Sequence, residues 1–346
     1  MKKIILLVCI AIICSSCKQE YVVRSFESVT IQKFDMDSTS IRAIIAVNKD
    51  ELLFAGSRGD IGLTEDGGKT WGIEYIKYKD SIVPHFRSLA KTTSSIFALS
   101  IANPALLYKI AFGKKKVVYK EEHEKVFYDA MTFIDDKTGI AIGDPMNGCT
   151  SIIMTNDGGE TWEKIDCANL PEVKEGEASF AASNTNIAFY KNTIWVVTGG
   201  TRARVLKSAD KGRTWKIIET PFIQGNGPQG IYSVDFYDEN TGIIMGGDFS
   251  KPNENKANKA ITIDGGKSWI LVADGEAPNY KSCVKYIPGT KGKEVIAVGK
   301  TGVSFSNDGG RTWKDISKDD YYAIAFVDKN TAWLSGHQKI GKLVLK

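Results

Sequence analysis

Short hydrophobic segments alternate along the chain with polar turns that are rich in Gly, Asp and Thr. Residues 151–154 (SIIM) precede one such turn, and residues 163–165 (EKI) follow it. Hydrophobic runs of this length, bounded by Gly, Asp and Asn, are typical of β-strands joined by hairpin turns. The pattern therefore predicts an all-β protein.

Five of the turns share one octapeptide pattern, which we call the repeat turn: Ser or Thr, any residue, Asp, any residue, Gly, a charged residue, Ser or Thr, and Trp. The Asp side chain can accept hydrogen bonds from its own turn, the Gly can take a positive φ, and the Trp can pack back over the hairpin. We therefore expect Asp66, Asp157, Asp210, Asp264 and Asp308 to be structural. The five copies occupy residues 64–71, 155–162, 208–215, 262–269 and 306–313.

The spacing of the repeat turns predicts a β-propeller. Their starts are 91, 53, 54 and 44 residues apart, and the first step is about twice the others, so one unit has lost its turn. A period of about 40–50 residues with four short strands is typical of a propeller blade. We expect a single ring of seven four-stranded blades, with six or eight as the alternative counts. The units begin near residues 42, 86, 129, 178, 231, 282 and 321.

A spare strand at residues 28–34 precedes the first unit, while the last unit has room for only three strands. Pairing the spare strand into the last blade would close the ring and remove an open sheet edge. The N-terminal strand is therefore predicted to close the propeller, which would span residues 28–346.

The N-terminus has the features of an export signal. Met1 is followed by Lys2 and Lys3, and residues 4–13 form an apolar run that is too short to span about 30 Å of hydrocarbon. With the small residues before Cys17, the segment resembles a bacterial lipoprotein signal. That resemblance implies acylation of Cys17 after removal of the signal (1–17), with residues 18–27 as a tether. Cleavage without lipid is the alternative. The absence of Asp after Cys17 favours the outer membrane, with the protein periplasmic or surface-exposed.

Composition narrows the function classes. The chain has 346 residues, a net charge of +4 and no long basic run, so a nucleic-acid partner is not expected. Three cysteines follow the signal, Cys149, Cys167 and Cys283, without a CxxC motif. We expect idle thiols, with a Cys149–Cys167 bridge as the alternative. The three histidines are scattered, so we expect no metal site and no cofactor.

Charged residues gather in the loops on one side of the predicted ring. The repeat turns lie at one end of the strands, whereas the loops between second and third strands, and those between units, lie at the other. Propellers usually bind ligands at such a tunnel mouth; a solvated rim is the alternative. Small residues between 178 and 184 are expected to leave the tunnel open. The candidate ligand-binding residues are Arg87, Asp129, Asp144, Glu177, Asn184, Arg204 and Asp248, and the candidate catalytic residues are Glu175, Glu177 and Asp144.

The repeat turns are identified as Asp-box (BNR) repeats, and from about residue 40 onward the chain resembles propellers related to the photosystem II stability/assembly factor family. It is more similar to the exported bacterial branch labelled oxidoreductase or glycosyl hydrolase. Sialidases also carry Asp boxes, but the Arg-Ile-Pro segment usual in their first blade is absent here. The closer likeness is carried by residues 86–88, 128–131, 143–145, 176–178, 180–185, 198–200 and 246–248.

The resemblance implies a binding mode, because the assembly-factor relatives act by holding partner proteins. We therefore expect a lipid-anchored, non-catalytic propeller, with WD40-like repeats, that binds a protein or glycan at the tunnel face. The alternative is a glycoside hydrolase that uses Glu175 or Glu177 with Asp144 and Arg204. An oxidoreductase is not favoured, because no nucleotide-binding motif is present.

Overall fold

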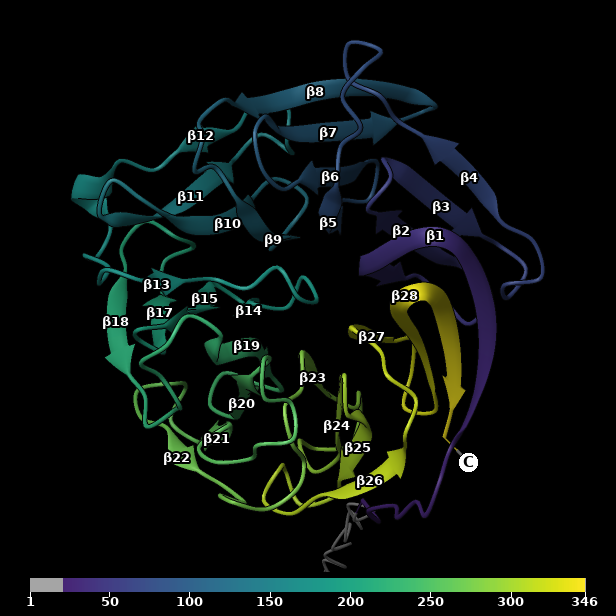
Figure 1. The fold of residues 1–346 in the computed structure, drawn as a ribbon, viewed down its shortest axis with the longest axis vertical. Coiled ribbons are helices and arrows are strands. Elements are labelled where there is room, and N and C mark those ends of the chain that lie inside the picture. Colours follow the sequence, from purple (N-terminus) through teal and green to yellow (C-terminus); the bar gives the residue numbers. More distant parts are fainter. Residues whose placement is uncertain (1–20, 346) are drawn as a thin grey trace, which may run out of the picture.

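The computed structural model describes residues 21–345, and these residues form an all-β propeller (Figure 1). The predicted signal segment and Cys17 lie outside the described residues. None of the helices within residues 21–345 has the length and apolar character needed to cross a membrane. The single short helix in this part of the chain is the 3-10 turn η1 (Cys167–Asn169).

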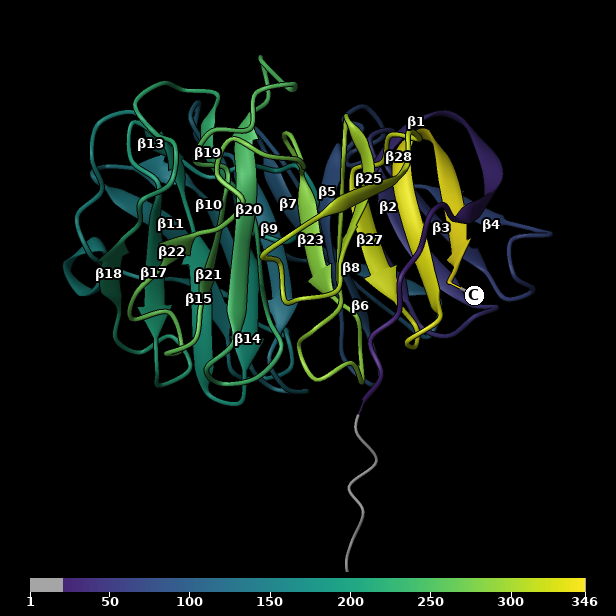
Figure 2. The same ribbon diagram turned by 90° about the horizontal axis from the view of Figure 1, so that it is seen from below.

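The strands are arranged around a central axis (Figures 1 and 2). The first sheet contains β27 (Ala323–Phe326), β28 (Thr331–Val344), β1 (Thr30–Ala46), β2 (Leu52–Gly56), β3 (Asp60–Thr64) and β4 (Gly72–Tyr75). The next two contain β5 (Phe86–Lys91), β6 (Ile96–Ser100), β7 (Ala105–Ala111) and β8 (Lys114–Glu121), and β9 (Tyr128–Phe133), β10 (Gly139–Met146), β11 (Cys149–Thr155) and β12 (Glu163–Lys164).

The other three sheets complete the ring. One contains β14 (Ile187–Tyr190), β15 (Thr193–Val197), β17 (Arg204–Ser208) and β18 (Lys216–Glu219). Another contains β13 (Glu177–Ala178), β16 (Gly199–Gly200), β19 (Gln229–Phe236), β20 (Gly242–Asp248), β21 (Lys259–Thr262) and β22 (Ile270–Leu271). The last contains β23 (Cys283–Tyr286), β24 (Val295–Gly299), β25 (Gly302–Ser306) and β26 (Lys314–Ser317).

The number of sheets corrects the prediction. The strands of residues 21–345 form six hydrogen-bonded sheets, four with four strands and two with six, so the expected seven separate blades are wrong. The cause is the length of β1, whose 17 residues pair with two different strands, β28 and β2. Its first half pairs with β28 from Thr30 to Asp35, and its second half pairs with β2 from Ile41 to Ala46. The first and last sequence units therefore share one sheet, and the N-terminal strand closes the ring.

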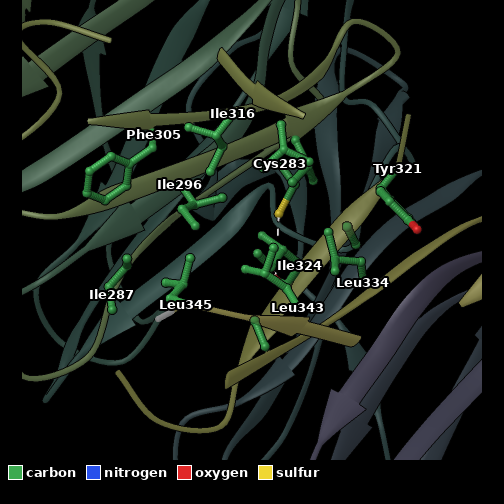
Figure 3. Packing of buried hydrophobic residues seen from close by; sticks show 14 of the residues in the cluster. Cys283, Ile287, Ile296, Phe305, Ile316, Tyr321, Ile324, Leu334, Leu343 and Leu345 are labelled. Carbon is green, nitrogen blue, oxygen red and sulfur yellow. Dashed lines mark hydrogen bonds between the residues drawn. The ribbon is translucent and has the colours of Figure 1, made fainter. Parts of the chain in front are cut away.

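Hydrophobic side chains from neighbouring sheets form the core. In the cluster drawn in Figure 3, Ile296 and Phe305 of the β23–β26 sheet meet Ile324 and Leu343 of the adjoining sheet. Cys283 lies in this cluster as a buried free thiol. Both faces of the inner strands are covered by neighbouring sheets, which explains why the sequences of these strands are nearly continuous apolar runs.

Each repeat turn is held by its own aspartate. Asp210 accepts hydrogen bonds from Ser208 Oγ at 2.8 Å, Thr214 N at 2.9 Å and Thr214 Oγ1 at 2.6 Å. The bond from Thr214 Oγ1 lowers the pKa of Asp210 to about 2. Gly212 has a φ of 87°, and a Cβ there would lie 2.7 Å from Met154 Sδ, so Gly is needed at this position. The other four repeat turns have the same Asp contacts to the Ser or Thr residues at either end of the turn.

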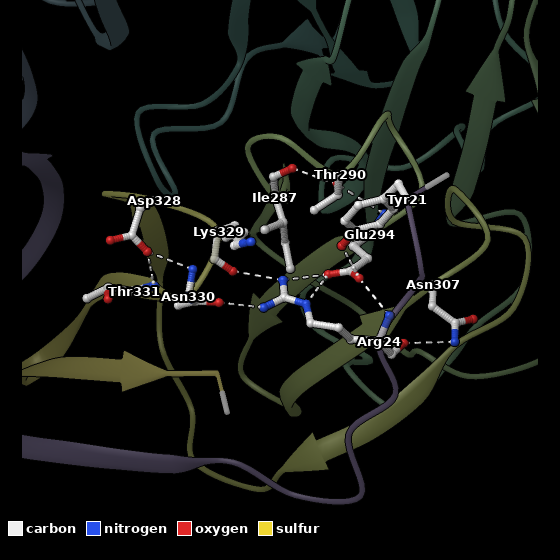
Figure 4. A network of polar contacts seen from close by, with 10 residues as sticks. All are labelled: Tyr21, Arg24, Ile287, Thr290, Glu294, Asn307, Asp328, Lys329, Asn330 and Thr331. Atoms are coloured by element: carbon white, nitrogen blue, oxygen red, sulfur yellow. Dashed lines mark hydrogen bonds and ion pairs between the residues drawn. The ribbon is translucent and has the colours of Figure 1, made fainter. Parts of the chain in front are cut away.

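Residues 21–27, which the sequence assigned to the tether, pack on the ring (Figure 4). Arg24 Nε donates to Glu294 Oε2 at 2.9 Å and Arg24 Nη1 donates to Asn330 Oδ1 at 2.8 Å, while Tyr21 also bonds to Glu294. Phe26 is buried in the core cluster. Asn330 and Glu294 lie at the end of the strands that carries the repeat turns, so the chain enters the propeller from that face (Figure 2).

Cys149 and Cys167 form a disulfide, with their Cα atoms 5.5 Å apart, so the expectation of idle thiols is wrong for this pair. The chain after β11 turns back through η1, and Val173 N bonds to Gly148 O at 3.2 Å. This return places Cys167 beside the start of β11. The 18-residue separation alone did not show that the loop folds back.

Candidate functional site

The segment between β13 and β14 extends into the middle of the ring (Figure 1). Ala181 O accepts from Arg87 Nη1 at 3.2 Å and Ala182 O accepts from Arg42 Nη1 at 3.1 Å. These partners come from β5 and β1, which belong to different sheets. We call residues 179–185 the plug.

The far end of the plug is tied to other inner strands. Ser183 Oγ donates to Ser282 O at 2.7 Å, and Thr185 Oγ1 donates to Ser233 Oγ at 2.7 Å. Asn184, with a φ of 59°, donates to Leu89 O and accepts from the backbone N–H of Met131, each at 2.9 Å. The expectation of an open tunnel is therefore wrong, because the small side chains let the plug pack across the channel. Asn184 is one of the residues whose hydrogen bonds hold the plug in place.

The plug separates two cavities. One, of about 530 Å³, is lined by Ser183, Asn184 and Thr185 and lies toward the repeat turns. The other, of about 720 Å³, has plug residues 179–182 as its floor and opens on the opposite face. This second cavity, which we call the axial cavity, is on the side where the sequence placed its candidate residues. Its mouth is formed by connections such as the turn between β24 and β25, which carries Lys300 and lies at the opposite strand ends from the repeat turns.

Two arginines lie side by side at the floor of the axial cavity. Arg42 and Arg87 donate to adjacent carbonyl groups of the plug, and Tyr322 lies under the Arg42 guanidinium at 4.0 Å from its ring centroid. Neither arginine forms an ion pair with a carboxylate of residues 21–345, and Arg42 Nε is buried without a hydrogen-bond partner there. Burial, followed by repulsion from Arg42, lowers the pKa of Arg87 to about 10. The charge of Asp129 attracts Arg87, but the two groups form no ion pair in the described part of the chain.

Three carboxyl groups line the same cavity, those of Asp129, Asp144 and Asp320, and Asp320 forms an ion pair with Lys339 at 2.6 Å. Asp129 is fully buried, and neither of its oxygens has a hydrogen-bond partner within residues 21–345. Asp144 is half-buried and accepts from Ser179 N at 2.9 Å. Burial and then the charge of Asp144 raise the pKa of Asp129 well above its usual value, and burial raises that of Asp144. Burial thus favours the protonated form of Asp129, in which the carboxyl group can donate a hydrogen bond.

Aromatic side chains form another wall of the axial cavity. Phe180 of the plug stacks on Tyr232 with a centroid distance of 3.9 Å, and Tyr280 meets Tyr232 edge-on at 4.9 Å. Phe249 stands at the mouth and is 51% exposed. A hollow with aromatic walls and a few convergent polar groups is the usual form of a ligand site.

Other sequence-nominated residues lie elsewhere. Glu177 and Arg204 form a buried ion pair with each other, and Asp248 is buried, with Oδ1 accepting from Ser250 N at 2.9 Å. Glu175 is exposed, and none of these four lines the axial cavity. The structure thus brings together Arg87, Asp129 and Asp144 but separates them from Glu175, Glu177, Arg204 and Asp248. Within residues 21–345, no three His, Cys, Asp or Glu side chains are arranged to hold a metal ion.

Several residues that line the axial cavity were not among the candidates predicted from the sequence, although the sequence carries a signal for them. The cavity is lined by residues at the start of successive units: Arg42, Arg87, Asp129, Tyr232, Ser282 and Tyr322. Each lies within about a residue of a unit start read from the repeat. Comparing that one position between units would have nominated Arg42 and Tyr322 with Arg87 and Asp129.

Comparison of the sequence with models of known families and with curated proteins gives no match. Solved structures do match. A structure of YCF48 bound to D1 peptide is 13% identical with a TM-score of 0.66, covering 93% of this chain and 100% of that one. YCF48 from Cyanidioschyzon merolae is 14% identical with a TM-score of 0.64, covering 91% and 98%. The WD40 repeats of RRP9 are 10% identical with a TM-score of 0.65, covering 94% and 100%. These likenesses show the propeller fold.

Proposed function

We propose that this protein is a non-catalytic scaffold that holds a partner protein at the axial cavity. The observation that carries the proposal is the cavity itself: a hollow with an aromatic wall, a closed floor and two arginines that form no ion pair with a carboxylate of residues 21–345. The structure of YCF48 bound to D1 peptide supports binding of a protein segment by a propeller of this shape. A glycan in the same cavity is the alternative ligand.

Partner capture tests the role of the cavity. Full-length protein solubilised in detergent would be incubated with envelope extract, and the captured proteins compared between wild type and Arg42→Ala/Arg87→Ala. We expect the double variant to lose a specific partner, and circular dichroism should show that it keeps its β-sheet fold although it loses the hydrogen bonds from Arg42 and Arg87 to the plug. Arg58→Ala is the matched control, because Arg58 is an exposed arginine on the same face but outside the cavity. A partner that the double variant retains would contradict the proposal.

We further propose that Cys17 carries the lipid that anchors the protein, with the outer membrane as its location. Each buried CH₂ contributes about 0.8 kcal/mol, so two or three acyl chains hold a protein stably on a membrane. Cys17→Ser should abolish incorporation of labelled palmitate and prevent normal processing of the signal. Palmitate labelling that persists in Cys17→Ser would contradict lipidation at this residue.

A glycosidase is the second candidate function, and the carboxyl pair of the axial cavity favours it. Asp129 is fully buried, whereas Asp144 is half-buried and hydrogen-bonded, and such contrasting environments are typical of acid–base pairs. Glu177 is unsuited to the role because Arg204 neutralises it. Release of reducing sugar from envelope glycans by wild type, and its loss in both Asp129→Asn and Asp144→Asn, would establish the activity. No release by wild type would favour the scaffold.

A further inference from the structure

The axial cavity is open at one end and closed at the other. The plug closes its floor with contacts to β1, β5, β19 and the chain before β23, so a bound chain cannot pass through the ring. A folded loop would need room for two chain segments, one entering and one leaving, whereas a chain end needs room for one. The cavity volume of about 720 Å³ lies within the range of about 300–1,000 Å³ typical of small ligand sites. The geometry therefore suits a chain terminus better than a loop.

Hydrogen-bond donors meet at this closed end. Adjacent carbonyl groups, Ala181 and Ala182, hold the two guanidinium groups next to each other. A guanidinium has five N–H donors, and within residues 21–345 Arg42 uses one side-chain nitrogen and Arg87 two. The buried carboxyl group of Asp129 lies near the backbone N–H of Ala181, but neither of its oxygens forms a hydrogen bond of ordinary geometry within residues 21–345.

The local charge selects an anion. Burial, followed by the charges of Arg87 and Arg42, lowers the pKa of His85 to about 4, so this neighbour stays neutral near pH 7. Within residues 21–345, neither Asp129 nor Asp144 forms an ion pair with these arginines, although the charges of Asp129 and Arg87 attract each other. The third carboxyl group of the cavity, Asp320, is paired with Lys339. Paired guanidinium groups bind carboxylates through parallel N–H···O bonds.

We propose that the axial cavity binds the free α-carboxylate at the C-terminal end of a partner polypeptide, with Arg42 and Arg87 as its donors and Asp129 hydrogen-bonded beside them. This inference rests on the proposed function and names the part of the partner that is recognised. The aromatic wall formed by Phe180 and Tyr232 packs against the last side chains of the bound segment. Capture of a terminal carboxylate is a known mode of peptide recognition.

The test uses two pools of N-acetylated random pentapeptides that differ only at their ends. One pool carries a free α-carboxylate and the other an α-carboxamide. Binding to the full-length protein in detergent is measured by saturation-transfer difference NMR. We expect the free-acid pool to bind, and the amide pool to bind at least tenfold more weakly.

Variants connect the preference to the cavity. Arg42→Gln and Arg87→Gln should each remove the preference for the free acid, Arg87→Lys should retain part of it because the charge remains, and Arg58→Gln should leave it unchanged. Melting temperatures identify any variant that fails to fold. If a Gln variant does not fold, the proposal is judged by whether Arg87→Lys reduces the preference for the free acid. Equal binding of the two pools, or a preference that survives Arg87→Gln, would overturn the proposal.

Competition distinguishes other anions. Displacement of the free-acid pool by sodium glucuronate or inorganic phosphate at lower concentrations than by the peptides themselves would overturn the proposal in favour of a general anion site. Partner capture that depends on Arg42 and Arg87, combined with equal binding of the two pools, would leave the scaffold function standing and reject the chain end as its target. If the free-acid pool binds preferentially but partner capture is unchanged in the Arg42 and Arg87 variants, the carboxylate site stands and the scaffold function at this cavity is rejected.

Discussion

Arg204 and Glu177 form a buried ion pair in which Arg204 Nε donates to Glu177 Oε1 at 3.0 Å, and their side chains are only 4% and 0% exposed. Glu177 Oε1 also accepts from Thr198 Oγ1 at 2.7 Å, and Arg204 Nη2 donates to Glu172 O at 3.1 Å. The pair thereby fastens the loop that leads into the plug onto β17. Residues that looked like ligand contacts in the sequence instead hold the floor of the cavity in place.

Removing one partner of this pair should be costly. Arg204→Met leaves the Glu177 carboxylate buried without its counter-charge, and we expect a loss of about 3–5 kcal/mol in the free energy of unfolding. Urea unfolding followed by tryptophan fluorescence measures the loss. Arg202→Met, at an exposed arginine two residues away, is the control and should change stability little. A loss below about 1 kcal/mol, the range of surface ion pairs, would contradict the buried pair.

The repeat-turn tryptophans should behave as core residues. Trp162 is 6% exposed and packs edge-on against Phe133 at a centroid distance of 5.7 Å. We expect Trp162→Ala to lower the free energy of unfolding by about 3–5 kcal/mol, because it leaves a large cavity. Glu160→Ala in the exposed part of the same turn is the control. Chemical denaturation compares the two, and equal small losses would show that Trp162 does not support the core.

The stability of the protein should depend on Asp129 and pH. Burial and the neighbouring Asp144 raise the pKa of Asp129, so the folded state holds a proton that the unfolded state releases above about pH 4. The contribution of Asp129 to the free energy of unfolding is fully present below about pH 4, and it is lost as the pH rises from there through the pKa of Asp129 in the folded state. Asp129→Asn should therefore unfold at a higher temperature than wild type at pH 8, by an amount equivalent to about 1–3 kcal/mol, and the gap should shrink toward pH 4.

The control for this pH series is Asp35→Asn, at an exposed aspartate of β1. Its melting temperature should stay close to that of wild type across the same range. A melting temperature for Asp129→Asn that lies below that of wild type at every pH would contradict the prediction. It would show that the Asp129 carboxyl group stabilises the folded protein.

The Cys149–Cys167 disulfide should stabilise the sheet that contains β11. Closing a loop of this length is worth about 3 kcal/mol in the chain-entropy model, so Cys149→Ser/Cys167→Ser should unfold at lower urea concentration than wild type. Dithiothreitol should lower the wild-type midpoint to that of the double variant and leave the double variant unchanged. A wild-type midpoint that is insensitive to dithiothreitol would mean that the bridge does not contribute.

Local sequence was sufficient where the interactions are local. The hydrogen bonds of Asp210 reach residues two to four positions away, so an octapeptide predicts them. The alternation of connections between strand ends also predicts on which face Arg87, Asp129 and Asp144 meet. The blade count failed because β1 is shared between two neighbours, a choice made by pairing with the distant β28.

The roles of individual charged residues were harder to predict. The sequence shows that Arg87 and Arg204 both lie near the start or end of a strand, but it does not show that one faces Glu177 and the other faces the plug. The difference depends on contacts such as that of Arg87 with Ala181, which lies 94 residues away in the chain.

The sequence by itself determined the strands, the repeat turns and the face that carries the charged loops, because these follow from hydrophobic alternation and from hydrogen bonds within a few residues. Only the tertiary structure decided that the channel is plugged and that, among the residues the structure describes, Arg204 has a carboxylate partner whereas Arg42 and Arg87 have none. Those outcomes depend on packing between segments as far apart as Arg42 and Ala182, 140 residues, where each side chain finds its partner only after the ring has closed.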